Sequence, residues 1–368
     1  MPVDPFTLRQ GAVGAPPLHY GNPLGEQREL AAGHAIVDLS DRDVLSVSGP
    51  DRLSWLDSLT SQRLNGIAPG VSAETLLLDP SGRVEYAARV LDDGETTWLL
   101  MDAGTGAGFF AFLTKMRFML RVEVRDRSAE FATVGTIGEL SEHPRLASVA
   151  AAPNGVPLVW VDPWRSVVAG GFQYAALPNH PADGWNYLEV LVDRARVDEL
   201  GAVLAAGSLA LEALRIEVWR PRAATEIDGT TIPHEMDWLR SAVHLSKGCY
   251  RGQETVAKVH NLGHPPRRLV LLHLDGSEGV LPQPGDEVLL GSGDDSTVVG
   301  RVTAASLHHE LGPIALAVLK RSADPTAALT VPTAAGPVLA AAQQVIVPPD
   351  AGAEAHVPRL PRIGGVRR

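Results

Sequence analysis

Hydrophobic and polar positions along the chain recur with two different periods, and their order predicts an α+β protein. Residues 43–49 alternate apolar and polar side chains, which is typical of a strand with one buried face. Leu53, Leu56 and Leu59 then recur at helical spacing, and 106–119 has the apolar pattern of a second helix. Between these helices, strands are expected at 75–79, 84–91 and 97–101.

A similar order of elements occurs a second time. Strands are expected at 132–137, 157–161 and 187–192, and helices at 194–206 and 208–219. Pro221 ends the last helix because proline lacks the backbone N–H and clashes with the preceding turn. The repeated strand-helix-strand-strand-strand-helix order favours two related α+β units over a doubly wound parallel sheet.

The pattern changes after Pro265-Pro266, where short strands separated by Gly, Pro and Asp follow without a long helix. This pattern predicts a small antiparallel β-barrel or sandwich. Residues 348–368 contain few large apolar side chains, which predicts disorder. The expected organisation is an irregular lead-in (1–30), a first α+β unit (31–130), a second α+β unit (131–265), a barrel (266–345) and a disordered tail (346–368).

Composition limits the classes of partner. The formal net charge of −11 over 368 residues argues against a general polyanion-binding surface, and so against direct nucleic-acid binding. It still permits a local basic pocket for a small anion. Residues 1–20 do not have the pattern of a signal peptide, and no apolar stretch reaches the roughly 20 residues needed to span a bilayer. We expect a cytoplasmic protein without membrane contact.

One segment, KGCYRGQE at 247–254, holds the only cysteine and one of four lysines. Gly248 and Gly252 permit a tight turn into a helix that begins near Gln253. The helix N-terminus and the Lys247 ammonium would favour the thiolate of Cys249. A lone cysteine is often a small buried hydrophobe instead, but the polar neighbours oppose that alternative. Without a second thiol, it implies a reducing compartment or a reactive role.

This segment resembles the signature of the YgfZ-type folate-binding proteins, a branch of the aminomethyltransferase-like superfamily linked to iron–sulfur cluster assembly and repair. Three weaker matches support the resemblance, which covers about residues 30 to 322. They are LRIE at 214–217 followed by RPR at 220–222, VSGPDR at 47–52, and GRVTAA at 300–305.

The resemblance implies a ring of two related α+β units plus a C-terminal antiparallel β-barrel around a central tetrahydrofolate site. The cofactor would be tetrahydrofolate or a one-carbon derivative, and the partners iron–sulfur assembly proteins or client enzymes. Cys249 and Lys247 would be the catalytic residues. The implied cofactor-binding residues are Arg215, Glu217, Glu189, Tyr250, Gln253 and Glu254.

Two departures from the glycine-cleavage enzymes bear on the activity. Their Asn and Asp after the first meander are replaced by the sequence at 100–105, and their Gly-Tyr-Thr-Gly-Glu segment is absent. The segment most similar to it is at 183–189, where Glu189 is the candidate acid for the pterin. We therefore expect an accessory protein without glycine-cleavage activity. The alternatives are a folate-dependent one-carbon transferase of the aminomethyl type and a tRNA-modification factor.

The candidate residues allow more than one chemistry. Arg215 and Glu217 are two residues apart and face different sides of a helix, so one could contact a ligand while the other pairs with a neighbouring domain. A structural salt bridge at a domain junction is an equal alternative. A Cys249 thiolate could attack a one-carbon unit, ligate iron or be oxidised, but one thiol cannot hold a cluster. The histidines lack metal-binding spacing, so no metal site is expected.

Overall fold

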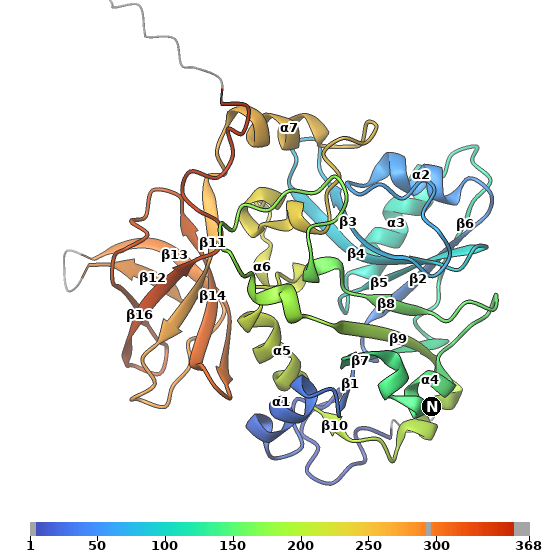
Figure 1. Ribbon diagram of the computed structural model, residues 1–368, viewed down its shortest axis with the longest axis horizontal. Coiled ribbons are helices and arrows are strands. Elements are labelled where there is room, and N and C mark those ends of the chain that lie inside the picture. Colours follow the sequence, from blue (N-terminus) through green and yellow to red (C-terminus); the bar gives the residue numbers. More distant parts are fainter. Residues whose placement is uncertain (1–4, 292–295, 357–368) are drawn as a thin grey trace, which may run out of the picture.

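The computed structural model describes residues 5–291 and 296–356 (Figure 1). The first α+β unit contains an antiparallel sheet with the strand order β3-β4-β5-β2-β6. Its strands are β2 (Asp43–Ser48), β3 (Ser72–Leu78), β4 (Val84–Asp92), β5 (Thr96–Met101) and β6 (Glu123–Asp126). Helices α2 (Arg52–Leu59) and α3 (Gly106–Met116) bury Trp55, Phe109 and Leu113 in one core with the sheet.

The second sheet has the order β10-β1-β7-β9-β8, and β1 and β10 are its parallel pair. Its strands are β1 (Ile36–Asp38), β7 (Phe131–Ile137), β8 (Val159–Val161), β9 (Tyr187–Asp193) and β10 (Ala205–Ala206). Helix α4 (Pro144–Val149) contributes Leu146 and Val149 to a core with Val134 and Val190. Helix α1 (Pro23–Ala31) belongs to the same part of the molecule and is capped by the Asn22 side chain, which accepts from Gly25 N at 3.1 Å.

The barrel is closed, because β16 pairs with β11. Its strands are β11 (Arg267–Leu274), β12 (Glu287–Leu290), β13 (Thr297–His308), β14 (Gly312–Lys320), β15 (Leu329–Pro332) and β16 (Val338–Val345). Alternate residues point inward, as strand geometry requires, so Val270 and Leu272 fill the barrel while Leu269 and Leu271 pack outside it. The outward residues join the barrel to the rest of the molecule.

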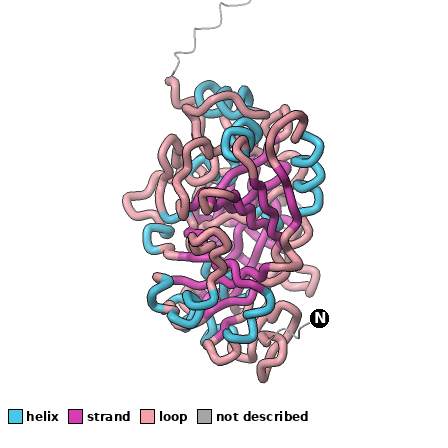
Figure 2. The backbone as a smooth tube through the Cα atoms, turned by 90° about the vertical axis from the view of Figure 1, so that its right-hand side faces the viewer, coloured by secondary structure: helices cyan, strands magenta, loops and turns pink. Residues whose placement is uncertain are grey.

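Helices α5 (Ser208–Glu217), α6 (Ala223–Glu226) and α7 (Gln253–Leu262) stand between the barrel and the two sheets (Figure 1). One core includes side chains from both sheets, α5 and the outer face of the barrel, which ties the three parts together. In the view turned by 90°, the strands run through the interior and the helices lie around them (Figure 2). Short 3-10 helices occupy 140–142, 163–165, 181–184, 194–200, 233–236 and 238–240.

Several sequence predictions need correction. The lead-in (1–30) was expected to be irregular but contains most of α1. Residues 36–38 fall within the span expected for the first unit (31–130), but they form β1 of the second sheet. The helix expected at 194–206 is a short 3-10 helix followed by β10. Within the described part of the chain, no helix combines the length and apolar character that a bilayer span requires.

The first part of the expected tail is ordered. In residues 346–356, Ile346, Val347 and Ala351 are buried, and Glu354 N donates to the His260 carbonyl of α7 at 2.9 Å. The composition of 346–368 did not reveal this because backbone hydrogen bonds to a helix end need no large side chains. The rest of that predicted tail, 357–368, lies outside the described residues.

Arg220 joins the two α+β units. Its Nη2 donates to Glu74 Oε1 on β3 at 2.8 Å, and its Nε donates to Asp162 Oδ2 after β8 at 2.9 Å. The side chain is 7% exposed. Burial opposes the cation, but Asp162 and Glu74 outweigh it and raise the pKa of Arg220. The two sheets therefore meet through a buried triad of ion pairs.

Replacing Arg220 should be costly. Arg220→Met leaves Glu74 and Asp162 buried without their cation, so we expect a loss of about 3–5 kcal/mol in the free energy of unfolding. Arg196→Met is the matched control, because the Arg196–Glu199 pair is 40% and 47% exposed and should contribute less than about 1 kcal/mol. Urea unfolding measures both variants, and similar losses would contradict a special role for the buried triad.

Candidate functional site

A cavity lies between the two α+β units and the lead-in, beneath the start of α5. Its wide limb has a volume of about 460 Å³. The wide limb is lined by Gly14, Ala15, Pro16, Leu18, Asp38, Leu39, Asp41, Arg42, Asp102, Ala103, Ser208, Arg222 and Ala224. A narrow limb shares Leu39, Arg42, Ser208 and Arg222 with it. We call the two limbs together the central cavity.

The narrow limb combines aromatic walls with charged groups. It is further lined by Arg89, Asp162, Trp185, Tyr187, Leu211, Glu212, Arg215, Arg220 and Pro221. Trp185 and Tyr187 stack on each other with ring centroids 5.3 Å apart, and Trp185 Nε1 donates to Asp162 at 2.9 Å. No described barrel residue lines either limb.

Glu189, a predicted cofactor-binding residue, is fully buried on β9 behind this wall. Its Oε1 accepts from Tyr187 OH at 3.0 Å and pairs with Arg89 Nε at 3.0 Å and with Arg42. Arg42, Arg89 and Tyr187 line the cavity, and Glu189 does not. Glu189 therefore holds two arginines of the wall in place.

Asp102 is the carboxylate at the end of β5 that does reach the cavity. Its Oδ1 accepts from Arg89 at 3.2 Å, and its Oδ2 accepts from Ala224 N at 3.2 Å. Burial opposes ionisation, but the charges of Arg89, Arg42 and Arg222 outweigh it and hold the pKa of Asp102 below its usual range. The cavity thus presents a stable anion on one wall.

Arg215 and Glu217 diverge from α5, as their spacing predicted. Arg215 lines the narrow limb, where its Nη1 donates to Glu226 at 3.0 Å and to the Arg220 carbonyl at 2.7 Å. Its Nε donates to Glu212 at 3.0 Å. Glu217 points to the barrel and pairs with His308 Nε2 at 3.2 Å. Arg215 therefore belongs to the cavity, and Glu217 to the junction with the barrel.

The Lys247 side chain has a structural setting. Its ammonium donates to the carbonyls of Thr60 and Gln62, each at 2.8 Å, and to that of Asp57. These carbonyls follow or end α2, where cations are favoured. Burial lowers the pKa of Lys247 to about 8. The ammonium also lies 3.5 Å from Asp57 Oδ2, so Lys247 fixes the signature segment 247–254 to α2 through backbone and side-chain oxygens.

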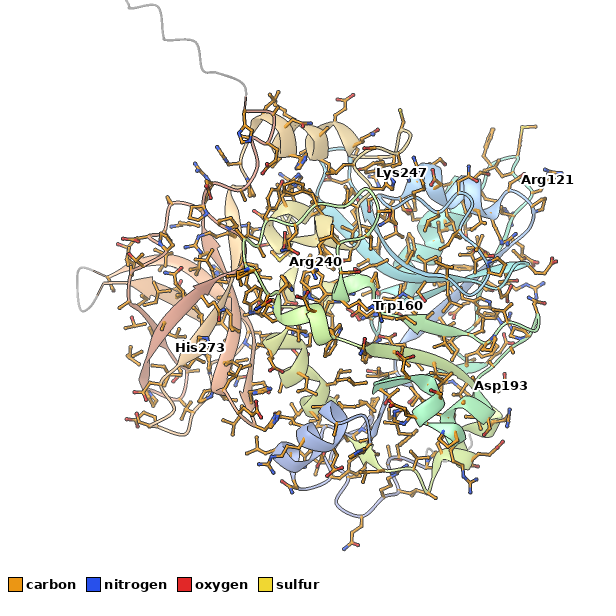
Figure 3. All side chains as sticks on the ribbon, viewed as in Figure 1. Arg121, Trp160, Asp193, Arg240, Lys247 and His273 are labelled. Atoms are coloured by element: carbon orange, nitrogen blue, oxygen red, sulfur yellow. The ribbon has the colours of Figure 1, made fainter. Side chains whose placement is uncertain are left out.

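The remaining signature residues differ in how deeply they are buried. Tyr250 is buried in the shared core, and Gln253 Nε2 donates weakly to the Lys247 carbonyl at 3.5 Å. Cys249 and Glu254 are exposed. The predicted helix is confirmed as α7, with Gly252 as its N-cap. Figure 3 shows Lys247 beside α2, above Trp160, whose ring packs near Tyr187 of the narrow limb.

The structure therefore separates the predicted site into two places. Arg215 and Glu189 belong to the central cavity and its supporting wall, whereas none of the signature residues lines either limb. Sequence reasoning did not single out Arg42 or Arg89 as site residues, whereas Arg222 lies in the family-like RPR at 220–222. Arg89 carried a usable signal, because it is a charged residue within the strand pattern of 84–91. Arg42 lies between two strands and gave none.

The donor set of the central cavity suits an organic ligand with polar edges. The wide limb offers aliphatic walls, an ionised Asp102 and guanidinium groups, and its volume of about 460 Å³ falls within the usual range for small-molecule sites. The aromatic wall lines the narrow limb, which adds about 50 Å³. Among residues 5–291 and 296–356, no group of three or more His, Cys, Asp or Glu side chains is placed to hold a metal ion.

The signature segment should be sensitive to a single methyl group. Gly252 has φ +82°, and a Cβ there would lie 2.6 Å from the Asp79 carbonyl oxygen. We expect Gly252→Ala to lower the free energy of unfolding by about 2 kcal/mol or more, from backbone strain plus the clash. Gly248→Ala is the control, since nothing lies within 4 Å of its Cβ position, and its effect should stay within about 0.5 kcal/mol. Equal effects in urea unfolding would refute this account.

No family model matches the chain. It is 26% identical over 286 residues to the chloroplastic protein At1g60990 of Arabidopsis thaliana, whose name describes a putative transferase. That match covers 74% of this chain and 62% of At1g60990, which is less than two thirds of the length of At1g60990. It is 26% identical over 330 residues to the aminomethyltransferase of Symbiobacterium thermophilum, covering 83% and 84% of the two chains. It is 22% identical over 264 residues to the tRNA-modifying protein YgfZ of Colwellia psychrerythraea, covering 69% and 75%.

Among solved structures, the chain is similar to the glycine cleavage system aminomethyltransferase T from Bartonella henselae. The TM-score is 0.69 and the identity 18%, and the match covers 91% of this chain and 94% of that one. This likeness confirms the predicted fold class. The chain has the aminomethyltransferase-like α+β fold with a closed antiparallel β-barrel. In sequence it is similar to aminomethyltransferases and to a YgfZ protein.

Proposed function

We propose that this protein binds tetrahydrofolate, or a one-carbon derivative of it, in the central cavity and supports the assembly or repair of iron–sulfur enzymes through the Cys249 thiol. The observation that carries the folate part is the cavity itself. Its acid, arginines and aromatic walls converge between the two α+β units of an aminomethyltransferase-like fold.

The lining residues fit a reduced folate. A pterin needs an acid for its donor edge, and Asp102 is ionised in the wide limb. Leu18 and Leu39 supply aliphatic surface for flat rings in the same limb, and Trp185 and Leu211 line the narrow limb beside it. The glutamate tail needs cations, and Arg222 is reached from both limbs. When bound, the folate would supply a carrier for a one-carbon unit, while these residues orient its rings and exclude water.

The iron–sulfur part rests on the signature segment. Cys249 is exposed on a segment that Lys247 and Gly252 hold firmly against α2 and the β3–β4 turn. A fixed, accessible thiol suits contact with a second protein. Since one thiol cannot hold a cluster, any role with iron requires a partner that supplies further ligands, such as an assembly protein or a client enzyme.

A one-carbon transferase of the aminomethyl type is the alternative. The aminomethyltransferase of Symbiobacterium thermophilum aligns over most of both chains, and Asp102 provides an ionised group beside the proposed folate. Formation of methylenetetrahydrofolate from an aminomethylated carrier protein would favour this alternative. A role in tRNA modification is suggested by the name of the Colwellia relative, but the net charge of −11 argues against direct RNA binding.

Reduced folates should stabilise the folded protein. We expect 5-formyltetrahydrofolate to raise the thermal midpoint and to release or absorb heat in calorimetry, because a ligand that binds only the folded state must stabilise it. Ser208→Phe should abolish both effects, since Ser208 lines both limbs and a phenyl ring would fill their junction. Leu209→Phe is the matched control, because Leu209 is 38% exposed and lines neither limb. Absence of heat and of any thermal shift with the unmodified protein would refute folate binding.

Cys249→Ser should separate folding from function. The side chain is exposed, so we expect a change in the free energy of unfolding within about 0.5 kcal/mol and unchanged folate binding. The variant should fail to restore iron–sulfur enzyme activity in cells that lack the protein. A serine hydroxyl is a weaker nucleophile than a thiolate and a poorer ligand for iron. Ser246→Ala, an exposed change in the same loop, should restore it. Full restoration by Cys249→Ser would remove support for a reactive thiol.

A further inference from the structure

Most of the arginines that line the central cavity are already committed to buried carboxylates. Each faces at least one acid that is 4% exposed or less: Arg42 and Arg89 face Glu189, Arg215 faces Glu226, and Arg220 faces Glu74 and Asp162. Their charges are balanced inside the protein. A ligand anion would have to displace a buried carboxylate to use them, which would leave that carboxylate without its partner.

Arg222 differs from these four. One carboxylate neighbour is Glu212, at 3.5 Å from Nη1, and both Glu212 oxygens already accept hydrogen bonds from Arg215. The other is Asp102, whose pKa the Arg222 charge helps to lower. The Nε of Arg222 is buried and has no hydrogen-bond partner among the described residues. The Arg222 side chain is 34% exposed, against 6% for Arg215. Arg222 thus keeps donor capacity that a ligand can reach.

The position of Arg222 is well defined. Its backbone N donates to Glu226 Oε2 at 2.6 Å, and the residue is the N-cap of α6. Arg222 also lines both limbs, so its guanidinium stands where they meet. A buried donor without a partner costs free energy, and a carboxylate that accepts from the guanidinium fork would recover that cost.

We propose that Arg222 is the anchor for the glutamate-tail carboxylates of the bound folate. This inference rests on the proposed folate binding and adds the group that selects a folate over a pterin without a glutamate. Asp102 and the aliphatic surface of the wide limb would contact the rings, and Arg222, where the two limbs meet, would contact the tail. A guanidinium suits this task better than an ammonium, because its planar fork matches a carboxylate.

The test compares ligands with and without the tail. Calorimetry is carried out with 5-formyltetrahydrofolate and with 5-formyltetrahydropteroate, which lacks the glutamate. We expect Arg222→Gln to weaken binding of the first by about 10- to 100-fold, as for a lost charge-assisted hydrogen bond, and to leave binding of the second within about twofold. Arg222→Lys should recover only part of the loss. Arg83→Gln, an exposed change of the same charge outside the cavity, is the control.

The outcomes separate this inference from the proposed function. If the unmodified protein binds the folate and Arg222→Gln binds it as tightly, or loses both ligands equally, Arg222 is not the tail anchor. If the unmodified protein binds neither ligand, the proposed function fails. NMR of the arginine Nε–Hε resonances of the ¹⁵N-labelled protein then tests whether Arg222 binds a glutamate carboxylate. A saturable shift of the Arg222 resonance with p-aminobenzoylglutamate would support the anchor. No shift, or a shift with inorganic phosphate only, would overturn it.

Discussion

The buried pairing of arginines with carboxylates between the two sheets is the constraint on which the rest of the structure depends. Ionised groups are costly to remove from water, and they persist in an interior only where opposite charges and hydrogen bonds compensate them. Arg220 meets this requirement by bridging β3 and the segment after β8, and Glu189 meets it by pairing with Arg42 and Arg89. Both clusters require the two α+β units to be docked in one arrangement, because their members come from both.

This pairing also explains the character of the cavity. An apolar junction between two sheets would close by packing side chains together. Guanidinium groups held at fixed distances from carboxylates cannot collapse in this way, so a polar space remains beneath α5. The charges that hold the units together are therefore unsuited to ligand capture, since each is already balanced. Ligand recognition is left to groups that the network holds in position but that keep free hydrogen-bonding capacity. These are Asp102 on one wall and Arg222 on another.

Sequence patterns predicted most of the strands and the helices α2, α3 and α5, because periodicity reports which face of an element is buried. The signature segment likewise predicted α7, since Gly252 marks a left-handed N-cap. Pairing between distant segments is not encoded in local periodicity, which is why β1 was assigned to the wrong sheet. The separation of Lys247 and Cys249 from the cavity was hidden for the same reason. Arg215 was found because it lies in a family-like motif, whereas Arg42 pairs with Glu189, which is remote in sequence.

The two places that carry candidate chemistry are joined by a continuous buried path. Lys247 donates to the Gln62 carbonyl, and the Gln62 side chain donates to the Ser241 carbonyl at 3.0 Å. The Ser241 hydroxyl donates to Glu74 at 2.7 Å, and Glu74 accepts from Arg220 in the narrow limb. Because the linked polar groups are all buried, breaking any one link would leave an unsatisfied group in the interior. The backbone that presents Cys249 is thus held at a fixed position relative to the cavity wall, although the thiol itself faces solvent.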